Sequence, residues 1–195
     1  MRAVVVYCHP VEGSFCSVLR DAACRGLTGA GHDVTLIDVA ADDFNPVMSK
    51  DEWNLYYESG VHIPSDVEEY ASAVRDAEVL VFVYPTWWSS VPAQLKGWME
   101  RVLVPGIAFT FTDKNKLRPG LRKLKHVVVV TTFGSPRLYV RFINDNGSRL
   151  FHRSLRSTSP RLVRNHRLVH YKMDKSTPES RAKFVKKIET KLAQL

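Results

Sequence analysis

Two adjacent tryptophans, Trp87 and Trp88, stand in a short loop and offer a flat aromatic ligand a surface to stack on. The loop comprises Pro85, Thr86, Trp87, Trp88 and Ser89. It follows the continuous apolar run 79–83, which is typical of a strand buried on both faces of a parallel sheet. Ligands of open α/β sheets bind at the carboxyl ends of the strands, so this position predicts a ligand-binding loop.

A second loop, between the apolar run 2–8 and a predicted helix, has residue types that bind a phosphate. Ser14 and Ser17 offer hydroxyl donors, Gly13 allows close approach of the backbone, and His9 could add a donor or a positive charge. The helix start presents free N–H groups and a positive dipole end. A serine-rich helix cap accounts for the same residues. The loop has neither GxxxxGK[ST] nor GxGxxG, so neither a P-loop NTPase nor a dinucleotide-binding domain is supported.

A third loop follows the apolar run 127–130 and consists of Thr131, Thr132, Phe133 and Gly134. Its small residues would leave N–H groups facing the same crevice as the other two loops. Each loop has a plain structural explanation when taken alone. The coincidence of all three at strand ends favours a flavin site.

The elements that must position these loops alternate along the chain as repeated βα units. Strands are predicted over 2–8, 33–38, 78–84, 125–132 and 166–172. Helices are predicted over 15–29, 65–76, 92–104, 145–157 and 178–194. This alternation predicts an α/β three-layer sandwich around a five-stranded parallel sheet in the order 2-1-3-4-5.

Three segments fit the pattern less simply. The connection from Asp42 to Pro64 is long and aromatic, and both a lid or binding loop and an ordinary surface excursion remain open. The polar stretch 154–160 is interpreted as a loop. Ser176 with Glu179 predicts a capping box at the start of the last helix, with Pro178 in its first turn.

The length of 195 residues predicts one domain spanning 1–195. No apolar run approaches the roughly 18 residues of a membrane span, and the strand-like start leaves no room for a signal peptide, so we expect a cytoplasmic protein. Cys8, Cys16 and Cys24 are odd in number and form no zinc-binding pair. We therefore expect free thiols and no metal site.

The net charge of +8 is unevenly distributed. Residues 1–113 contain 7 Lys and Arg against 16 Asp and Glu, whereas residues 114–195 contain 21 against 4. A solvated basic face, an acidic partner, an anionic membrane surface and a phosphorylated cofactor all fit this asymmetry. The chain has no nucleic-acid-binding motif, and no nucleic-acid partner is expected.

Several motifs together resemble the flavodoxin-like NAD(P)H:quinone oxidoreductases. The pieces that carry the resemblance are His9 to Phe15, Pro85 to Trp88, the block VPAQLKGWMER over 91–101, and Thr131 to Gly134. The similarity extends over about residues 2–135 and includes the modulator-of-drug-activity type and the ancillary subunits of potassium-efflux systems. It implies a flavodoxin-like fold, noncovalent FMN or FAD, NAD(P)H as co-substrate, a quinone-like acceptor and a homodimer.

The resemblance also implies roles for individual residues. The residues near the flavin phosphate would be His9, Ser14, Phe15 and Ser17. The residues bordering the flavin ring would be Pro85, Thr86, Trp87, Trp88 and Ser89. The residues closing the other side of the ring would be Thr131, Thr132, Phe133 and Gly134. Trp88 is expected nearer the flavin than Trp87. Tyr139 matches a catalytic tyrosine, but the partner histidine has no match, since the nearest position is Asp145.

Other residues are expected to have structural roles or to be alternative catalytic candidates. Arg137 and His152 are the fallback candidates for catalysis. Trp98 is expected in the core and Gly97 at a close packing contact, with Lys96, Glu100 and Arg101 on the helix surface or at a subunit contact.

The mechanism implied is a ping-pong reaction in which NAD(P)H delivers a hydride to the flavin and an acceptor then takes two electrons. The chain length favours FMN, although Trp53 to Tyr57 could stack the adenine of FAD. An alternative is a flavin-binding regulatory subunit that docks an acidic partner through Arg153, Arg156, Arg161, Arg164 and Arg167. A one-electron shuttle of flavodoxin type is disfavoured because the chain is strongly basic.

Overall fold

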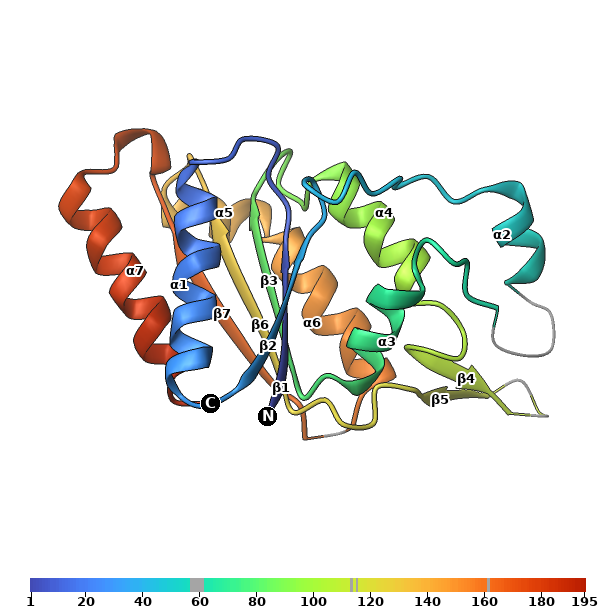
Figure 1. Cartoon of the computed structure of the whole chain (residues 1–195). Coiled ribbons are helices and arrows are strands. Elements are labelled where there is room, and N and C mark those ends of the chain that lie inside the picture. Colours follow the sequence, from blue (N-terminus) through green and yellow to red (C-terminus); the bar gives the residue numbers. More distant parts are fainter. Residues whose placement is uncertain (57–61, 113, 115, 161) are drawn as a thin grey trace.

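The computed structural model describes residues 1–195 except 57–61, 113, 115 and 161. Its centre is a parallel sheet of five strands (Figure 1). The strands are β1 (Arg2–Tyr7), β2 (Asp33–Asp38), β3 (Val79–Pro85), β6 (His126–Thr132) and β7 (Arg164–His170). They lie in the order β2-β1-β3-β6-β7. Counted along the chain this is 2-1-3-4-5, so the predicted topology is confirmed.

Long helices cover both faces of the sheet, which gives the three layers visible in Figure 1. On one face lie α1 (Phe15–Gly29) and α7 (Pro178–Leu192), and on the other lie α3 (Glu68–Asp76), α4 (Ala93–Val102) and α6 (Asn146–Thr158). Alternate strand residues feed the two cores: Val81 packs toward α1 and α7, whereas Phe82 packs toward α4 and α6. The sequence patterns place each of these five helices within a few residues of its observed bounds.

Several short elements have no counterpart in the predictions. They are α2 (Lys50–Leu55), α5 (Arg137–Ile143), the 3₁₀ turn η1 (Met173–Lys175) and the antiparallel hairpin of β4 (Phe109–Phe111) and β5 (Leu117–Pro119). Each is too short to show a clear periodicity in the sequence. No helix within the described residues has the length and apolar character required to cross a membrane.

Two local predictions are wrong. The capping box of α7 is formed by Thr177 and Ser180, because the Ser176 hydroxyl instead donates to the Met173 carbonyl. Pro178 does occupy the first turn. The stretch predicted as a loop over 154–160 is helical as far as Thr158, and its polar residues flank Leu155, which is 1% exposed and anchors the turn in the core.

Candidate cofactor site

A cavity of about 380 Å³ opens at the carboxyl end of the sheet, where the loops after β1, β3 and β6 meet. Its walls include eight of the predicted site residues, namely His9, Ser14, Phe15, Pro85, Thr86, Trp87, Thr132 and Gly134. The size falls within the roughly 300–1,000 Å³ of small-molecule sites. The loops that we expected to face one crevice therefore do share one cavity.

The loop after β1 presents the start of α1 to this cavity. Gly13 has a φ of +79°, a left-handed conformation that glycine adopts without strain. The Ser14 side chain caps α1 by accepting from the Ser17 N–H at 3.3 Å. The N–H groups of Phe15 and Cys16, both cavity residues, have no acceptor within the helix itself. The start of α1 thus has the chemistry of an anion site.

Ser17 lies outside the cavity wall. Ser17 is only 4% exposed, and its hydroxyl donates to the Ser14 carbonyl at 2.7 Å. The hydroxyl is therefore satisfied within the first turn of α1. Of the two serines, only Ser14 is left to approach a ligand.

The loop after β3 is a tight turn closed by paired hydrogen bonds between Trp87 and Ser90, at 3.1 and 3.0 Å. Trp88 and Ser89, at its tip, have φ values of +48° and +59°. This backbone directs Trp88 into solvent, where it is 101% exposed, and leaves Trp87 in the cavity wall with its ring 6.0 Å from that of His9. The structure therefore places Trp87 in the cavity wall and Trp88 outside it, and the expectation that Trp88 lies nearer the flavin stays a prediction.

The loops after β3 and β6 are fastened to each other. The Thr86 N–H donates to the Thr132 carbonyl at 3.0 Å, and the hydroxyls of Thr86 and Thr131 are hydrogen-bonded at 2.9 Å. Thr131 is fully buried and lies behind the cavity wall, not in it as predicted. Thr132 and Thr86 remain in the wall itself.

Phe133 turns away from the cavity. It is 4% exposed and stacks on Tyr171, with ring centroids 6.2 Å apart. The neighbouring Gly134 does line the cavity, and a Cβ atom there would lie 2.6 Å from Asp174 Oδ2. Glycine at 134 thus lets the two segments pack closely.

The segment after β7 completes the wall and was missed by sequence reasoning. Met173 and Asp174 line the cavity, and the Met173 N–H donates to the Phe133 carbonyl at 2.9 Å. Arg181 of α7 lies over the Phe15 ring, 5.5 Å from its centroid. The contact between the segment after β7 and the loop after β6 could have been predicted from the strand order, because that order places the fifth strand next to the fourth.

Burial sets the protonation of two groups, Cys16 in the cavity wall and His170 behind Phe15. Burial raises the pKa of the Cys16 thiol to about 11, and its Sγ lies 3.9 Å from the Thr132 hydroxyl. Burial, and secondarily the charge of Arg181, lowers the pKa of His170, whose ring meets Phe15 edge-on at 5.4 Å. Cys16 is therefore a neutral thiol at physiological pH and a poor nucleophile.

The candidates for proton transfer lie apart from this cavity. Tyr139 is 53% exposed on α5 and does not line the cavity. Asp145 is buried at the start of α6, where it accepts from the Ser148 N–H at 3.0 Å and pairs with Arg167 Nε at 2.6 Å. Burial lowers the pKa of His152. Asp145 is thus committed to capping α6 and to its ion pair.

The helix behind the tryptophan loop is scaffold, as expected for most of its residues. Trp98 is fully buried, and a Cβ at Gly97 would lie 2.1 Å from the Pro46 carbonyl oxygen. Lys96 and Glu100 form an exposed ion pair on the outer face. The close contact of Gly97 is made with the connection after β2.

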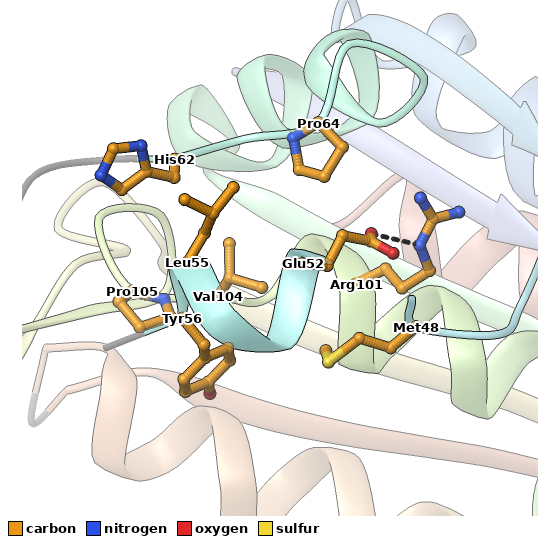
Figure 2. Close-up of a pocket in the computed structure, with 9 residues that line it drawn as sticks. All are labelled: Met48, Glu52, Leu55, Tyr56, His62, Pro64, Arg101, Val104 and Pro105. Carbon is orange, nitrogen blue, oxygen red and sulfur yellow. Dashed lines mark hydrogen bonds and ion pairs between the residues drawn. The ribbon is translucent and has the colours of Figure 1, made fainter. Parts of the chain in front are cut away.

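The prediction that Arg101 lies on the surface is wrong. Its side chain is 4% exposed and pairs with Glu52 at 2.7 Å and Asp66 at 2.8 Å, while also donating to the Asn45 carbonyl at 2.7 Å. Figure 2 shows Glu52 reaching from α2 toward Arg101 beside a small cavity. Arg101 therefore fastens the long connection after β2 to α4.

Comparisons with known proteins bear on this arrangement. The sequence matches a protein family described as having a flavodoxin-like fold, over residues 1–192. It is 33% identical to NAD(P)H dehydrogenase (quinone) 1 of Rattus norvegicus, a match covering 71% of this chain and 56% of that protein. It is 32% identical to the ribosyldihydronicotinamide dehydrogenase (quinone) of Homo sapiens, covering 77% of this chain and 71% of that one. The chain thus spans about half the length of the first relative.

Solved structures share the fold over the full chain. A protein of Streptococcus mutans UA159 has a TM-score of 0.85 at 25% identity, covering 100% of both chains. An FMN-dependent NADH-azoreductase of Bacillus anthracis, solved with FMN, has a TM-score of 0.74 at 13% identity, covering 100% of this chain and 99% of that one. With its sheet order and its sequence matches, the chain belongs to the flavodoxin-like family of NAD(P)H:quinone oxidoreductases.

Proposed function

We propose that the chain is a flavin-dependent NAD(P)H oxidoreductase that transfers two electrons, as a hydride, to quinones or similar acceptors. The observation that carries the proposal is the single cavity that combines the free start of α1 with the Trp87 ring. These two features match the two chemically different parts of a flavin nucleotide, its phosphate and its flat ring. The names of the relatives support the reaction class.

The residues of the cavity fit such a group. The N–H groups of Phe15 and Cys16, with the Ser14 hydroxyl, would hold the phosphate, and Trp87 and Pro85 would border the ring. A bound flavin supplies the hydride chemistry that amino-acid side chains lack. The protein keeps this part of the wall free of ionised nucleophiles, because the Cys16 thiol is neutral. No side chain has to act as a general base.

We infer FMN as the flavin. Trp53 and Tyr56, two of the residues that could stack an adenine, stack instead on each other, with centroids 6.1 Å apart and an interplanar angle of 21°. Tyr57, the third, lies outside the described residues. The FMN in the Bacillus anthracis azoreductase, which shares the fold, supports the same choice.

A homodimer is part of the proposal. Leu138 and Phe142 stand one helical turn apart on α5 and are 80% and 84% exposed, with Tyr139 between them at 53%. Burying this apolar stripe against a second copy would remove it from water. Tyr139 could then take part in the reaction only if the acceptor binds at this interface between the two copies. Tyr139→Phe tests this role by its effect on turnover at saturating acceptor.

The alternative of docking an acidic partner through five arginines is not supported as one continuous five-arginine surface. Arg153 and Arg156 are exposed on α6, Arg164 stands at the first position of β7, and Arg167 is paired with Asp145. Arg161 lies outside the described residues. The four described arginines lie on two elements, α6 and β7, and one of them, Arg164, lines the basic groove described below.

Steady-state kinetics with NADPH and a soluble benzoquinone test the proposed reaction. Initial-rate lines at several fixed quinone concentrations should run parallel, because NADPH oxidation and quinone reduction would occur in separate half-reactions at one cavity. Intersecting lines would contradict the ping-pong scheme and require both substrates to bind together.

A further inference from the structure

A basic groove lies at the amino ends of the strands, at the opposite end of the sheet from the cofactor cavity. Its volume is about 760 Å³, and its cationic lining consists of Arg2, Arg122, Lys123, Lys125 and Arg164. A second hollow of about 510 Å³, lined by Arg118, adjoins it and shares Arg122 and Pro160. Together the two form a continuous cationic depression that the proposed reaction does not use.

The groove is built on a fixed frame. Arg2 and Arg164 are the first residues of β1 and β7. The Lys125 N–H donates to the Glu78 carbonyl at 2.8 Å, and the Arg164 N–H donates to the Lys125 carbonyl at 2.9 Å. The Arg2 N–H donates to Glu78 Oε2 at 2.9 Å. These hydrogen bonds hold the strand ends side by side, so the backbone positions of Arg2, Lys125 and Arg164 are fixed relative to one another.

Acidic residues only partly balance this charge. Arg2 and Lys123 share Asp76, and Lys125 pairs with Glu78 at 2.6 Å. Within the described part of the chain, no carboxylate pairs with Arg118, Arg122 or Arg164. Three guanidinium groups along one depression therefore remain available to an anionic ligand.

His126 lines the groove and contacts His166 on the neighbouring strand β7. His126 Nδ1 lies 3.1 Å from His166 Nε2, and the two rings stack. Burial lowers the pKa of both histidines, and Arg164 and Lys191 lower it further. Nearby cations disfavour a further positive charge on either ring, in the same direction as burial.

Shape and lining distinguish among anionic ligands. The surface is concave, which suits a chain lying in it better than a flat bilayer. Its lining includes no Phe, Tyr or Trp among the described residues, so unpaired bases would lack stacking partners. It does include Leu162, which is 89% exposed, and Pro160. Cations beside exposed apolar groups fit an acidic peptide that also carries apolar side chains.

We propose that this groove docks an extended acidic segment of a partner protein, with carboxylates on Arg122 and Arg164 and an apolar side chain against Leu162. The proposal is independent of the proposed function, because the groove and the cofactor cavity share no residue.

The test measures fluorescence anisotropy of a labelled peptide built of Glu-Glu-Leu repeats, titrated with the full-length protein. The variant combines Arg122→Glu with Arg164→Glu. The matched control combines Arg153→Glu with Arg156→Glu on α6, which changes the net charge equally away from the groove. We expect saturable, salt-sensitive binding that weakens by about tenfold or more in the groove variant and by less than about twofold in the control.

Three outcomes would overturn the proposal: no saturable binding by the unmodified protein, equal weakening in both double variants, or tighter groove-dependent binding of oligo-dT or of phosphatidylserine vesicles than of the peptide. Melting temperatures of both variants equal to that of the unmodified protein would establish that folding is preserved. If melting differs, charge-neutral Arg122→Gln with Arg164→Gln replaces the groove variant.

Discussion

At the scale of single residues, the backbone decides which aromatic side chain can meet a flat ligand. Trp87 and Trp88 are neighbours, yet one lines the cavity and the other is fully exposed. The difference follows from the left-handed φ of Trp88 and Ser89. Such conformations are uncommon outside glycine, so sequence alone gave no reason to expect the turn.

Substitution of each tryptophan tests this assignment. Trp87→Ala should weaken FMN binding by about 1–3 kcal/mol, the usual value of aromatic stacking on a flat base. Trp88→Ala is the matched control and should leave affinity nearly unchanged, because its ring is in solvent. Flavin fluorescence titration of the apoprotein measures both. A larger loss of FMN affinity from Trp88→Ala than from Trp87→Ala would contradict this assignment and would support the expectation that Trp88 lies nearer the flavin.

Sequence reasoning identified residue types at the site better than side-chain directions. Ser14, Phe15 and Trp87 were placed by motif and do line the cavity. Ser17 and Phe133 belong to the same motifs but point elsewhere, because a helix-turn hydrogen bond and a ring stack hold them. Such contacts depend on neighbours that only the folded chain brings together.

At the scale of elements, the connection after β2 is organised by α4. Gly97 allows the Pro46 carbonyl to touch the helix, and Arg101 binds α2 through Glu52. Long helices and buried strands were predicted because their patterns extend over many residues. The connection was left open, since α2 is six residues long and its anchor comes from a distant helix.

The close approach at Gly97 predicts a clear loss of stability. In Gly97→Ala the new Cβ would clash with Pro46 backbone, and we expect a loss of about 1–3 kcal/mol in the free energy of unfolding. Gly29→Ala in α1 is the control, because its Cβ meets nothing within 4 Å. It should be neutral or stabilising by up to about 1 kcal/mol. Urea denaturation measures both, and equal effects would rule out the close contact.

The buried ion pair between Arg101 and Glu52 predicts a second loss. Arg101→Met leaves Glu52 without its partner, and we expect the free energy of unfolding to fall by roughly 3 kcal/mol. Lys96→Met on the same helix breaks an exposed pair with Glu100 and should cost less than about 1 kcal/mol. Denaturant unfolding compares the two. A loss from Arg101→Met no larger than that from Lys96→Met would show that the clamp is dispensable.

At the scale of the whole molecule, the two ends of the sheet have different electrostatic characters. The carboxyl end holds a cavity with a neutral thiol, and the amino end holds the basic groove lined by His126, which contacts His166. The charge asymmetry of the sequence therefore has a concrete location, in part at the strand starts. Composition alone could not locate it, because the cations come from three separate segments.

The histidine pair predicts how stability depends on pH. The pKa of His166 falls from 6.5 to about 4 on folding, chiefly through burial and then through Lys191 and His126. Between these values the unfolded chain binds protons that the folded chain does not, so the free energy of unfolding should decrease as pH falls from 6.5 to about 4. His166→Gln should flatten this decrease in thermal melts. An unchanged slope would contradict the assignment.

The central claim is that three loops of this chain form a flavin site, and the most direct measurement is to identify a cofactor. The purified protein should be yellow, or become so with added FMN, and mass spectrometry of the released compound should give FMN in an amount equimolar with the chain. The Trp87→Ala variant should retain less of it. A colourless protein that takes up neither FMN nor FAD would contradict the account.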